Sequence, residues 1–505
     1  MSMAANIVLL ASKGDADPDW AVDAKYLSSP VEPMDTAVGV TADSSGNVVV
    51  SSKGSPGFGV QCYNKFSNLH QLRFNNGISV SGGGVNSPEG EFVPNPNSTT
   101  RIVYNPTFDD PGNVNTWTVF NVFDVNTATG ELTTFAYGID TGSSSNESSY
   151  TQITSSGSDS SNSFYGCGMT KQSGSNEFPH LLKYNSAAAL QWSLVVQPQT
   201  GKYTGAGVST ANFGTLPHMV SDTSGNTYVS LKHTTDAGSP EVFSYKLMKF
   251  NSSGAQQWVR VVSGPQSSGI SATDGTYLYS ADAPTSSTLR VVATNVSDGT
   301  IAWEKTLTFS GNTPAVKQII ISGGYVYILS QTSNEVANTT NNTGMTWIKM
   351  STAGAVEWNR HIHASGDTYA TEFFGSAYNG AISGSKMYTI FEGLGGITTV
   401  KLPLDGSKTG VVGKLPFISF GGAEPFSYNS YVSDINVNAL SISASTTSTA
   451  TSSSSTYATT TTSITTTDVD VLSLGVTYNE AQIKNILAPL NIYNPVVTYS
   501  KRLLT

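Results

Sequence analysis

Residues 218–230 read His218-Met219-Val220-Ser221-Asp222-Thr223-Ser224-Gly225-Asn226-Thr227-Tyr228-Val229-Ser230. Two short apolar runs flank a polar turn. Because Asp bonds its own turn backbone and Gly-Asn tolerates a positive φ, this pattern predicts a β-hairpin. A second hairpin follows: its strands start at Tyr245 and Ala255, its turn is residues 251–254, and its last strand carries Trp258. Two hairpins in series predict a meander of four strands.

The same order of hairpins recurs along the chain. The second strands of the units begin near residues 47, 101, 163, 226, 276, 325 and 386, and the last strand often carries a tryptophan: Trp192, Trp258, Trp303 and Trp358. One such unit cannot bury both faces of its sheet, but seven stacked around an axis do so. We therefore expect an all-β fold, a seven-bladed β-propeller of four-stranded antiparallel blades, over residues 35–420. The low charge (12%) and the Gly-, Ser- and Thr-rich turns agree with this class.

These units resemble the repeats of bacterial-type β-propellers. The turns at Asp43 and Asp222 resemble the Asp-box turns of sialidase-type propellers, and the recurring tryptophans resemble those of quinoprotein-like propellers. The first resemblance implies that the Asp turns brace the periphery of the blades. We expect the tryptophans to pack between blades, since a repeated aromatic is more often a packing residue than a ligand platform.

Two flanks lie outside the repeats. Residues 1–34 are the candidate for a ring-closing strand, with Asn6–Ala11 as the preferred segment. Residues 421–505 form a C-terminal extension in which 441–467 are almost entirely Ser, Thr and Ala. Such a segment cannot offset its own ordering entropy, so we expect it to serve assembly by adding strands to other chains. Within it, 480–487 predict a short helix and 496–504 a strand.

No catalytic, cofactor-binding or metal-binding set stands out from the sequence. His361 and His363 alternate on a predicted strand and would share a face, but zinc needs a third and fourth ligand. Glu372 is near in sequence, but nothing fixes it in space. The acids at 109–110, 468 and 470 have no defined opposition across a cleft. Residues 82–84 are three glycines without the Lys-Ser/Thr pair of a phosphate loop. We expect no enzyme activity and no cofactor.

Charge and cysteine content narrow the partners. The net charge of −10 and the absence of basic tracts argue against nucleic acid, and no apolar stretch is long enough for a membrane span. Cys62 and Cys167 are the only cysteines, so no disulfide framework holds the fold, and sequence leaves their pairing open. Residues 1–13 lack a basic start and a long apolar run, so we expect no secretory signal.

A composition suited to life outside a cell, without an export signal, resembles that of structural proteins of tailed bacteriophages, which assemble in the cytoplasm and leave by lysis. The resemblance implies a virion protein, a tail or baseplate adaptor or a receptor-facing module, that binds other virion proteins and copies of itself. Two alternatives stay open. One is a carbohydrate-binding propeller with tyrosines such as Tyr203 or Tyr428 as sugar platforms. The other is a propeller enzyme, a polysaccharide hydrolase or a quinoprotein relative.

Overall fold

The computed structural model describes the 36 β-strands given below and some of the turns between them. The described residues outside strands are 43, 46, 161, 163, 185, 222–226, 251–255, 274–276, 286–287, 296–300, 310–311, 323–324, 352–355, 384–385, 404–409 and 439–441. The strands pair antiparallel, and no helix occurs in this part of the chain. The predicted all-β class is confirmed.

The described strands form seven sheets, which follow one another along the chain. Sheet 1 contains β2 (Thr36–Ala42), β3 (Val48–Gly54), β4 (Gly57–Phe66), β5 (Leu69–Val80) and β36 (Val476–Ala481). Sheet 2 contains β6 (Val85–Pro94), β7 (Thr99–Phe108), β8 (Trp117–Asn126), β9 (Leu132–Asp140) and β35 (Thr465–Asp468). Sheet 3 contains β10 (Phe164–Lys171), β11 (Glu177–Tyr184), β12 (Leu190–Gln197) and β34 (Ala458–Thr461).

The remaining four sheets continue this order. Sheet 4 contains β13 (Lys202–Tyr203), β14 (His218–Ser221), β15 (Thr227–Thr234), β16 (Phe243–Phe250), β17 (Gln256–Val262) and β33 (Ser452–Ser454). Sheet 5 contains β18 (Ile270–Thr273), β19 (Tyr277–Thr285), β20 (Thr288–Asn295), β21 (Ile301–Phe309) and β32 (Ile442–Ser445). Sheet 6 contains β22 (Asn312–Ser322), β23 (Tyr325–Asn334), β24 (Gly344–Ser351), β25 (Val356–Ala364), β31 (Ile435–Asn438) and β29 (Gly410–Val412). Sheet 7 contains β26 (Gly380–Ser383), β27 (Lys386–Gly393), β28 (Gly396–Pro403), β1 (Trp20–Tyr26) and β30 (Phe426–Ser427).

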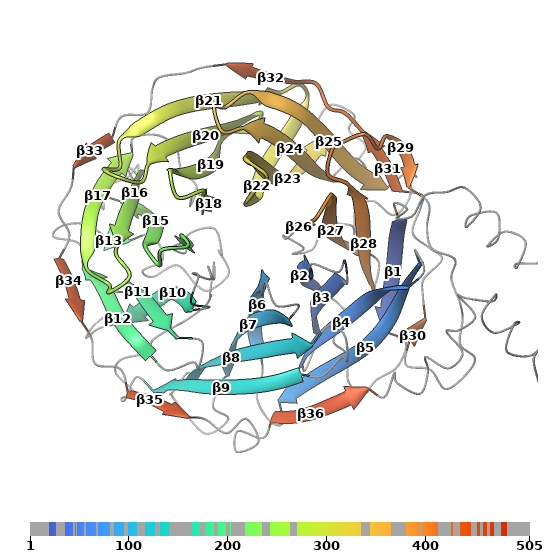
Figure 1. Cartoon of the computed structure of the whole chain (residues 1–505), viewed down its shortest axis with the longest axis horizontal. Coiled ribbons are helices and arrows are strands. Elements are labelled where there is room, and N and C mark those ends of the chain that lie inside the picture. Colours follow the sequence, from blue (N-terminus) through green and yellow to red (C-terminus); the bar gives the residue numbers. More distant parts are fainter. Residues whose placement is uncertain are drawn as a thin grey trace, which may run out of the picture.

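Figure 1 shows the seven sheets side by side around a common centre, with the first strand of each meander innermost and the last outermost. The expected second strands are found as β3, β7, β10, β15, β19, β23 and β27, each starting within two residues of its predicted place. The sheets hold four to six described strands, where sequence predicted four. A strand from residues 421–505 joins every sheet, β1 joins sheet 7, and the short strands β13 and β29 are added to sheets 4 and 6. Sheet 3 has three described strands of its own before the added β34.

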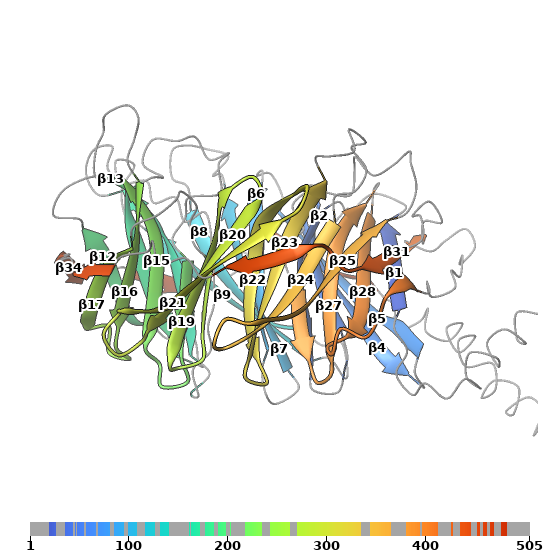
Figure 2. The same ribbon diagram turned by 90° about the horizontal axis from the view of Figure 1, so that it is seen from above.

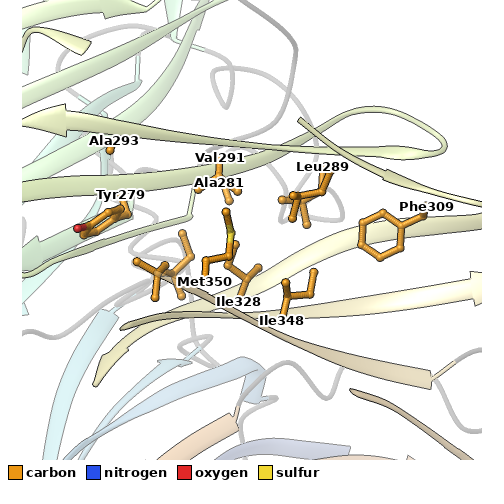
Figure 3. Close-up of a cluster of buried hydrophobic side chains, with 12 residues drawn as sticks. Tyr279, Ala281, Leu289, Val291, Ala293, Phe309, Ile328, Ile348 and Met350 are labelled. Atoms are coloured by element: carbon orange, nitrogen blue, oxygen red, sulfur yellow. The ribbon is translucent and has the colours of Figure 1, made fainter. Parts of the chain in front are cut away.

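The hydrophobic core lies between neighbouring sheets. Figure 3 shows one such layer, in which side chains of sheet 5 meet those of sheet 6. Leu289 and Val291 from β20 pack with Ile328 from β23 and Ile348 from β24, and all four are completely buried. Because successive side chains of a strand point to opposite faces of its sheet, a sheet with a neighbour on each side contributes to two such layers.

The N-terminal flank supplies a strand to the last sheet of the array. β1 pairs with β28 along five residues, from Trp20 opposite Lys401 to Ala24 opposite Ile397. A strand from residues 1–34 was predicted to do this, but the strand is 20–26, and Asn6–Ala11 lies outside the described residues. The predicted helix from Glu480 is wrong at its start, since Glu480 and Ala481 belong to β36 and pair with Asn76 and Asn75. Residues 482–505, including the predicted last strand, are outside the described part.

Candidate functional site

Asp turns hold the start of the second strand in sheets 4 and 5. Asp222 accepts the backbone N–H of Ser224 and of Asn226 at 2.9 Å each, and its second oxygen accepts the hydroxyl of Tyr228 at 2.9 Å. Burial, together with this carboxylate, raises the pKa of Tyr228. Sheet 5 repeats the arrangement, since the Tyr279 hydroxyl donates to Asp274 at 2.8 Å. The carboxylates are fully used in holding turns, which is a structural role.

A row of three side-chain types crosses the sheets from the second strand to the last. In sheet 4, Tyr228 lies opposite Lys249, which lies opposite Trp258. Sheets 3 and 6 have the same order, with Tyr165, Lys183, Trp192 and Tyr327, Lys349, Trp358. The lysine nitrogens lie 5.1 to 5.9 Å from the centroids of these tyrosine rings. Ring and cation attract at this range, so the lysine stabilises the packing of its row.

Three of the recurring tryptophans, in the last strands of sheets 3, 4 and 5, donate a hydrogen bond to the next sheet. Trp192 Nε1 donates to the Ser252 carbonyl oxygen at 3.2 Å, Trp258 Nε1 to that of Val296 at 3.1 Å, and Trp303 Nε1 to that of Thr352 at 2.9 Å. Each acceptor lies in the outer turn of the following sheet, so the predicted packing of these tryptophans between sheets is confirmed.

Each of these indoles also covers a turn glycine of the next sheet. A Cβ built on Gly254, Gly299, Gly354 or Gly406 would lie within 3.3 Å of the indole of Trp192, Trp258, Trp303 or Trp358 respectively. All four glycines have φ between +74° and +85°, a region that glycine adopts freely. The outer turns are therefore built to receive an aromatic ring, and we call this the Trp–Gly contact.

The row is repeated in sheet 7 by residues from opposite ends of the chain. Tyr388 lies opposite Lys401, and Lys401 lies opposite Trp20. The N-terminal strand thus places a tryptophan at the register position that Trp192, Trp258 and Trp358 occupy elsewhere. Sequence reasoning missed this, although Trp20 was a signal that could have identified the strand.

The C-terminal tail, residues 421–505, adds a strand to the outside of every sheet. In chain order its described strands join sheet 7 (β30), sheet 6 (β31), sheet 5 (β32), sheet 4 (β33), sheet 3 (β34), sheet 2 (β35) and sheet 1 (β36). The tail thus passes the sheets in the reverse of their own order, and Figures 1 and 2 show its strands (orange-red) along the outer side of the array. Strand addition was predicted, but onto other chains; the partners of the described tail strands are edges of this chain's own sheets.

The tail makes side-chain contacts in residues 435–445, which we call the anchor segment. Val437 is 2% exposed and packs in the core shared by sheets 6 and 7, beside Trp347 and Ile362. Its strand lies between β25 and β29, with backbone bonds on both edges. Further along, Leu440 and Ile442 are half-buried against the core between sheets 5 and 6.

Asn359 of β25 recognises the backbone of the anchor segment. Its Oδ1 accepts the N–H of Leu440 at 2.7 Å, and its Nδ2 donates to the carbonyl oxygen of Leu440 at 3.1 Å. The next residue is held by sheet 5, because the Ser310 N–H donates to the Ser441 carbonyl oxygen at 3.2 Å. Asn359, Ser310 and the edges of β21, β25 and β29 form what we call the anchor site. It fixes the register of an extended peptide across two sheets.

The predicted histidine pair lies beside this site. His361 and His363 stack with ring centroids 5.3 Å apart, and they lie opposite Asn438 and Asn436 of the tail. His361 is buried, and its Nδ1 shares a hydrogen bond of 2.9 Å with the Thr346 hydroxyl. No group of three or more His, Cys, Asp or Glu residues gathers in the described part of the chain. Glu372 lies outside it.

A polar cluster that sequence did not indicate joins the inner strands of sheets 4 and 5. Ser271 lies 3.2 Å from the Ser230 hydroxyl and 3.0 Å from that of Ser280, and its backbone N–H donates to His218 Nδ1 at 3.3 Å. Burial lowers the pKa of His218 to about 4, so the ring is neutral at pH 7. Since Nδ1 accepts, the ring proton is on Nε2. This arrangement holds two strands together and does not present a base to a serine.

A buried ion cluster also lies within sheet 5. Arg290 is bonded to Asp282 through two nitrogens, at 3.1 and 2.7 Å, and its third nitrogen is 3.9 Å from Glu304. All three side chains are buried. Burial raises the pKa of Asp282, against the opposing effect of the Arg290 hydrogen bond and charge. Two carboxylates share one cation, so the cluster depends on that cation being present.

The other sequence candidates are scattered. Tyr203 ends β13, Asp468 ends β35, and Cys62 and Cys167 lie in β4 and β10 of sheets 1 and 3. The remaining candidates are outside the described residues: Gly82, Gly83, Gly84, Asp109, Asp110, Tyr428 and Asp470. No helix in the described residues is long and apolar enough to cross a bilayer.

Comparisons with known proteins do not assign the chain to a family. No protein-family profile matches the chain, and no curated protein matches it. Among solved structures, the chain is similar to Phage phi92 endosialidase, at 10% sequence identity and a TM-score of 0.33, over 81% of this chain and 72% of that chain. Likeness at this level carries no functional information.

Proposed function

We propose that the seven sheets are the blades of a seven-bladed β-propeller closed between sheets 7 and 1. Two contacts support this. β1, which precedes sheet 1 in the chain, pairs in sheet 7, and the Ser383 hydroxyl of sheet 7 donates to the Asp43 carbonyl oxygen of sheet 1 at 2.7 Å. Full closure leaves only short edges exposed. An experimental structure with another number of blades, or with an open gap between sheets 7 and 1, contradicts the proposal.

We further propose that the chain is a structural component of a bacteriophage virion, a tail or baseplate adaptor or a receptor-facing module. The observation that supports this best is the tail: a long Ser/Thr-rich extension devoted to adding strands along the outside of seven sheets. The recurring tryptophans have a similar effect, since Trp192, Trp258 and Trp303 each join one sheet to the next. A chain whose recurring residues hold its sheets together suits a particle that must survive outside a cell.

In this proposal the chain acts by protein–protein assembly and not by catalysis, with other virion proteins and copies of itself as partners. The bonding of four polar side chains supports it, because each holds strands or turns: Asp222 and Asp274 in turns, His218 at its Nδ1, and Asn359 on the tail. The chain would be assembled in the host cytoplasm and carried on the particle.

The test is the composition of particles made by the genome that encodes this chain. Gradient-purified virions should contain the chain in a fixed ratio to the major tail protein, and disruption of its gene should yield particles that lack it and do not infect. An abundant host cytoplasmic protein, measured by mass spectrometry in the same fractions, controls for carry-over. If the chain follows that host protein and not the particles, the virion assignment is wrong. Release of sugar from host-surface polysaccharide by the purified chain would instead favour the enzyme alternative.

A further inference from the structure

We propose that the anchor site is a peptide-binding site which accepts the anchor segment of a second copy of this chain, so that copies are joined by exchanged tails. The inference extends the assembly role proposed above to a defined pair of surfaces. It depends on the tail and its site alone, so it can fail while the virion assignment stands.

The ligand is a short continuous peptide and the site is made from other parts of the chain. The site contacts residues 435–445 at three places: the buried Val437 side chain, both backbone groups of Leu440, and the half-buried Ile442. The residues that make these contacts belong to sheets 5, 6 and 7, and all of them precede residue 413 in the chain. Nothing in these contacts requires that peptide and site belong to one molecule. Addition of an extended peptide to a sheet edge is a general mode of recognition, with backbone bonds for affinity and pockets for specificity.

The rest of the tail would follow the anchor segment onto the same copy. Beyond residue 445 its described strands have three to six residues and pair with the outer edges of sheets 4 to 1. Two of them, 452–454 and 458–461, consist of Ser, Thr and Ala, so their pairing rests mainly on backbone bonds that any copy offers equally. Because the strands are linked, each docking event raises the effective concentration of the next. One specific anchor followed by many weak contacts gives stable exchange.

The chain length before the anchor segment allows the step to a neighbour. Between β30, which pairs with β1, and β31 lie residues 428–434. Seven residues span at most about 25 Å when extended, several times the spacing of about 4.8 Å between paired strands. β30 can therefore stay on its own sheet 7 while the anchor segment pairs with a copy alongside. The peptide that fits this site is this chain's own sequence, so the molecule that can supply it in exchange is a second copy.

The test is complementation between two full-length variants. Val437→Asp places a charge on the buried anchor residue and leaves the site intact, whereas Asn359→Ala removes both bonds to Leu440 and leaves the tail intact. Each variant alone should be mainly monomeric by native mass spectrometry. In a mixture, the Asn359→Ala chain should donate its tail to the vacant site of the Val437→Asp chain, and heterodimers should exceed either homodimer at least tenfold. Asn438→Asp, at the exposed neighbouring position, is the matched control and should behave like the native chain.

A second measurement keeps the inference open to refutation if a variant folds poorly. A fluorescent peptide of residues 433–447 should bind the Val437→Asp chain saturably, and at least tenfold more weakly after Asn359→Ala is added. In the Asn359→Ala chain, limited proteolysis after residue 435 should be at least tenfold faster than in the native chain. A mixture that stays monomeric while the peptide binds overturns the exchange between copies, and failure of the peptide to bind overturns the site itself.

Discussion

Gly406→Ala probes the Trp–Gly contact where it is tightest against a rigid ring. Gly406 has φ +74°, and a Cβ there would lie 2.7 Å from Trp358 Cδ2 and 2.8 Å from Cε2. The left-handed backbone costs a non-glycine residue about 1–2 kcal/mol. Overpacking against the indole, which is confined between sheets 6 and 7, adds about 1–3 kcal/mol. We expect Gly406→Ala to lower the free energy of unfolding by about 2–5 kcal/mol.

The matched control is Gly384→Ala in the same sheet. Gly384 also has a positive φ, +56°, but no atom would lie within 4 Å of its added Cβ, so only the backbone cost of about 1–2 kcal/mol applies. Urea unfolding followed by tryptophan fluorescence and by circular dichroism measures both variants. The two glycines lose similar freedom in the unfolded chain, so the difference between them reports the indole contact. If the two variants unfold within about 0.5 kcal/mol of each other, the turns are not built to receive the ring and this reasoning fails.

Three further predictions concern buried polar groups. Arg290→Met should lower the free energy of unfolding by about 3–5 kcal/mol at pH 7, because Asp282 and Glu304 lose their shared cation. Because burial raises the pKa of Asp282, this loss should shrink as the pH falls and that carboxylate takes up a proton, and a pH-independent loss would contradict the prediction. Because burial lowers the pKa of His218 to about 4, the folded chain binds fewer protons than the unfolded chain between pH 6.5 and 4. The free energy of unfolding should therefore fall by about 1–3 kcal/mol as the pH is lowered from 6.5 to 4. Urea unfolding of His218→Asn should show a flatter pH profile than the native chain. Trp303→Phe removes a 2.9 Å bond to Thr352, whereas the buried Trp358 Nε1 has no hydrogen-bond partner among the described residues; thermal unfolding should therefore show Trp303→Phe to be costlier than Trp358→Phe by about 1 kcal/mol.

The strands and their grouping could be predicted from sequence because the turn chemistry is local. Asp222 bonds the backbone of its own turn, and Gly225 takes φ +79°, so four or five residues determine the hairpin wherever they occur. The packing of Trp192, Trp258, Trp303 and Trp358 could be predicted because they recur at one position of the repeat, and a repeated position has one structural role.

The anchor site could not be predicted, because its parts are remote in sequence and individually ordinary. Asn359 is one asparagine among many, and only the fold places its amide beside Leu440. The pairing partner of the tail was predicted wrongly because composition shows only that the tail needs a partner. Composition does not say whether that partner is another molecule or the same one. Likewise, His218 and Ser271 lie on short strands of different sheets, and no local pattern relates them.

The pairing of β1 with β28 has a consequence for how the chain is made. Trp20 leaves the ribosome early, but its partner Lys401 is among the later residues to emerge, and Val476 must then find Val80. At roughly 5–20 residues per second, the first strand waits on the order of tens of seconds for its place. During that time sheets 1 to 6 can form in succession, since their own strands are close in sequence. Folding would thus end with the docking of β1 and of the tail, and a chain interrupted before residue 421 would leave all seven sheets without their tail strands.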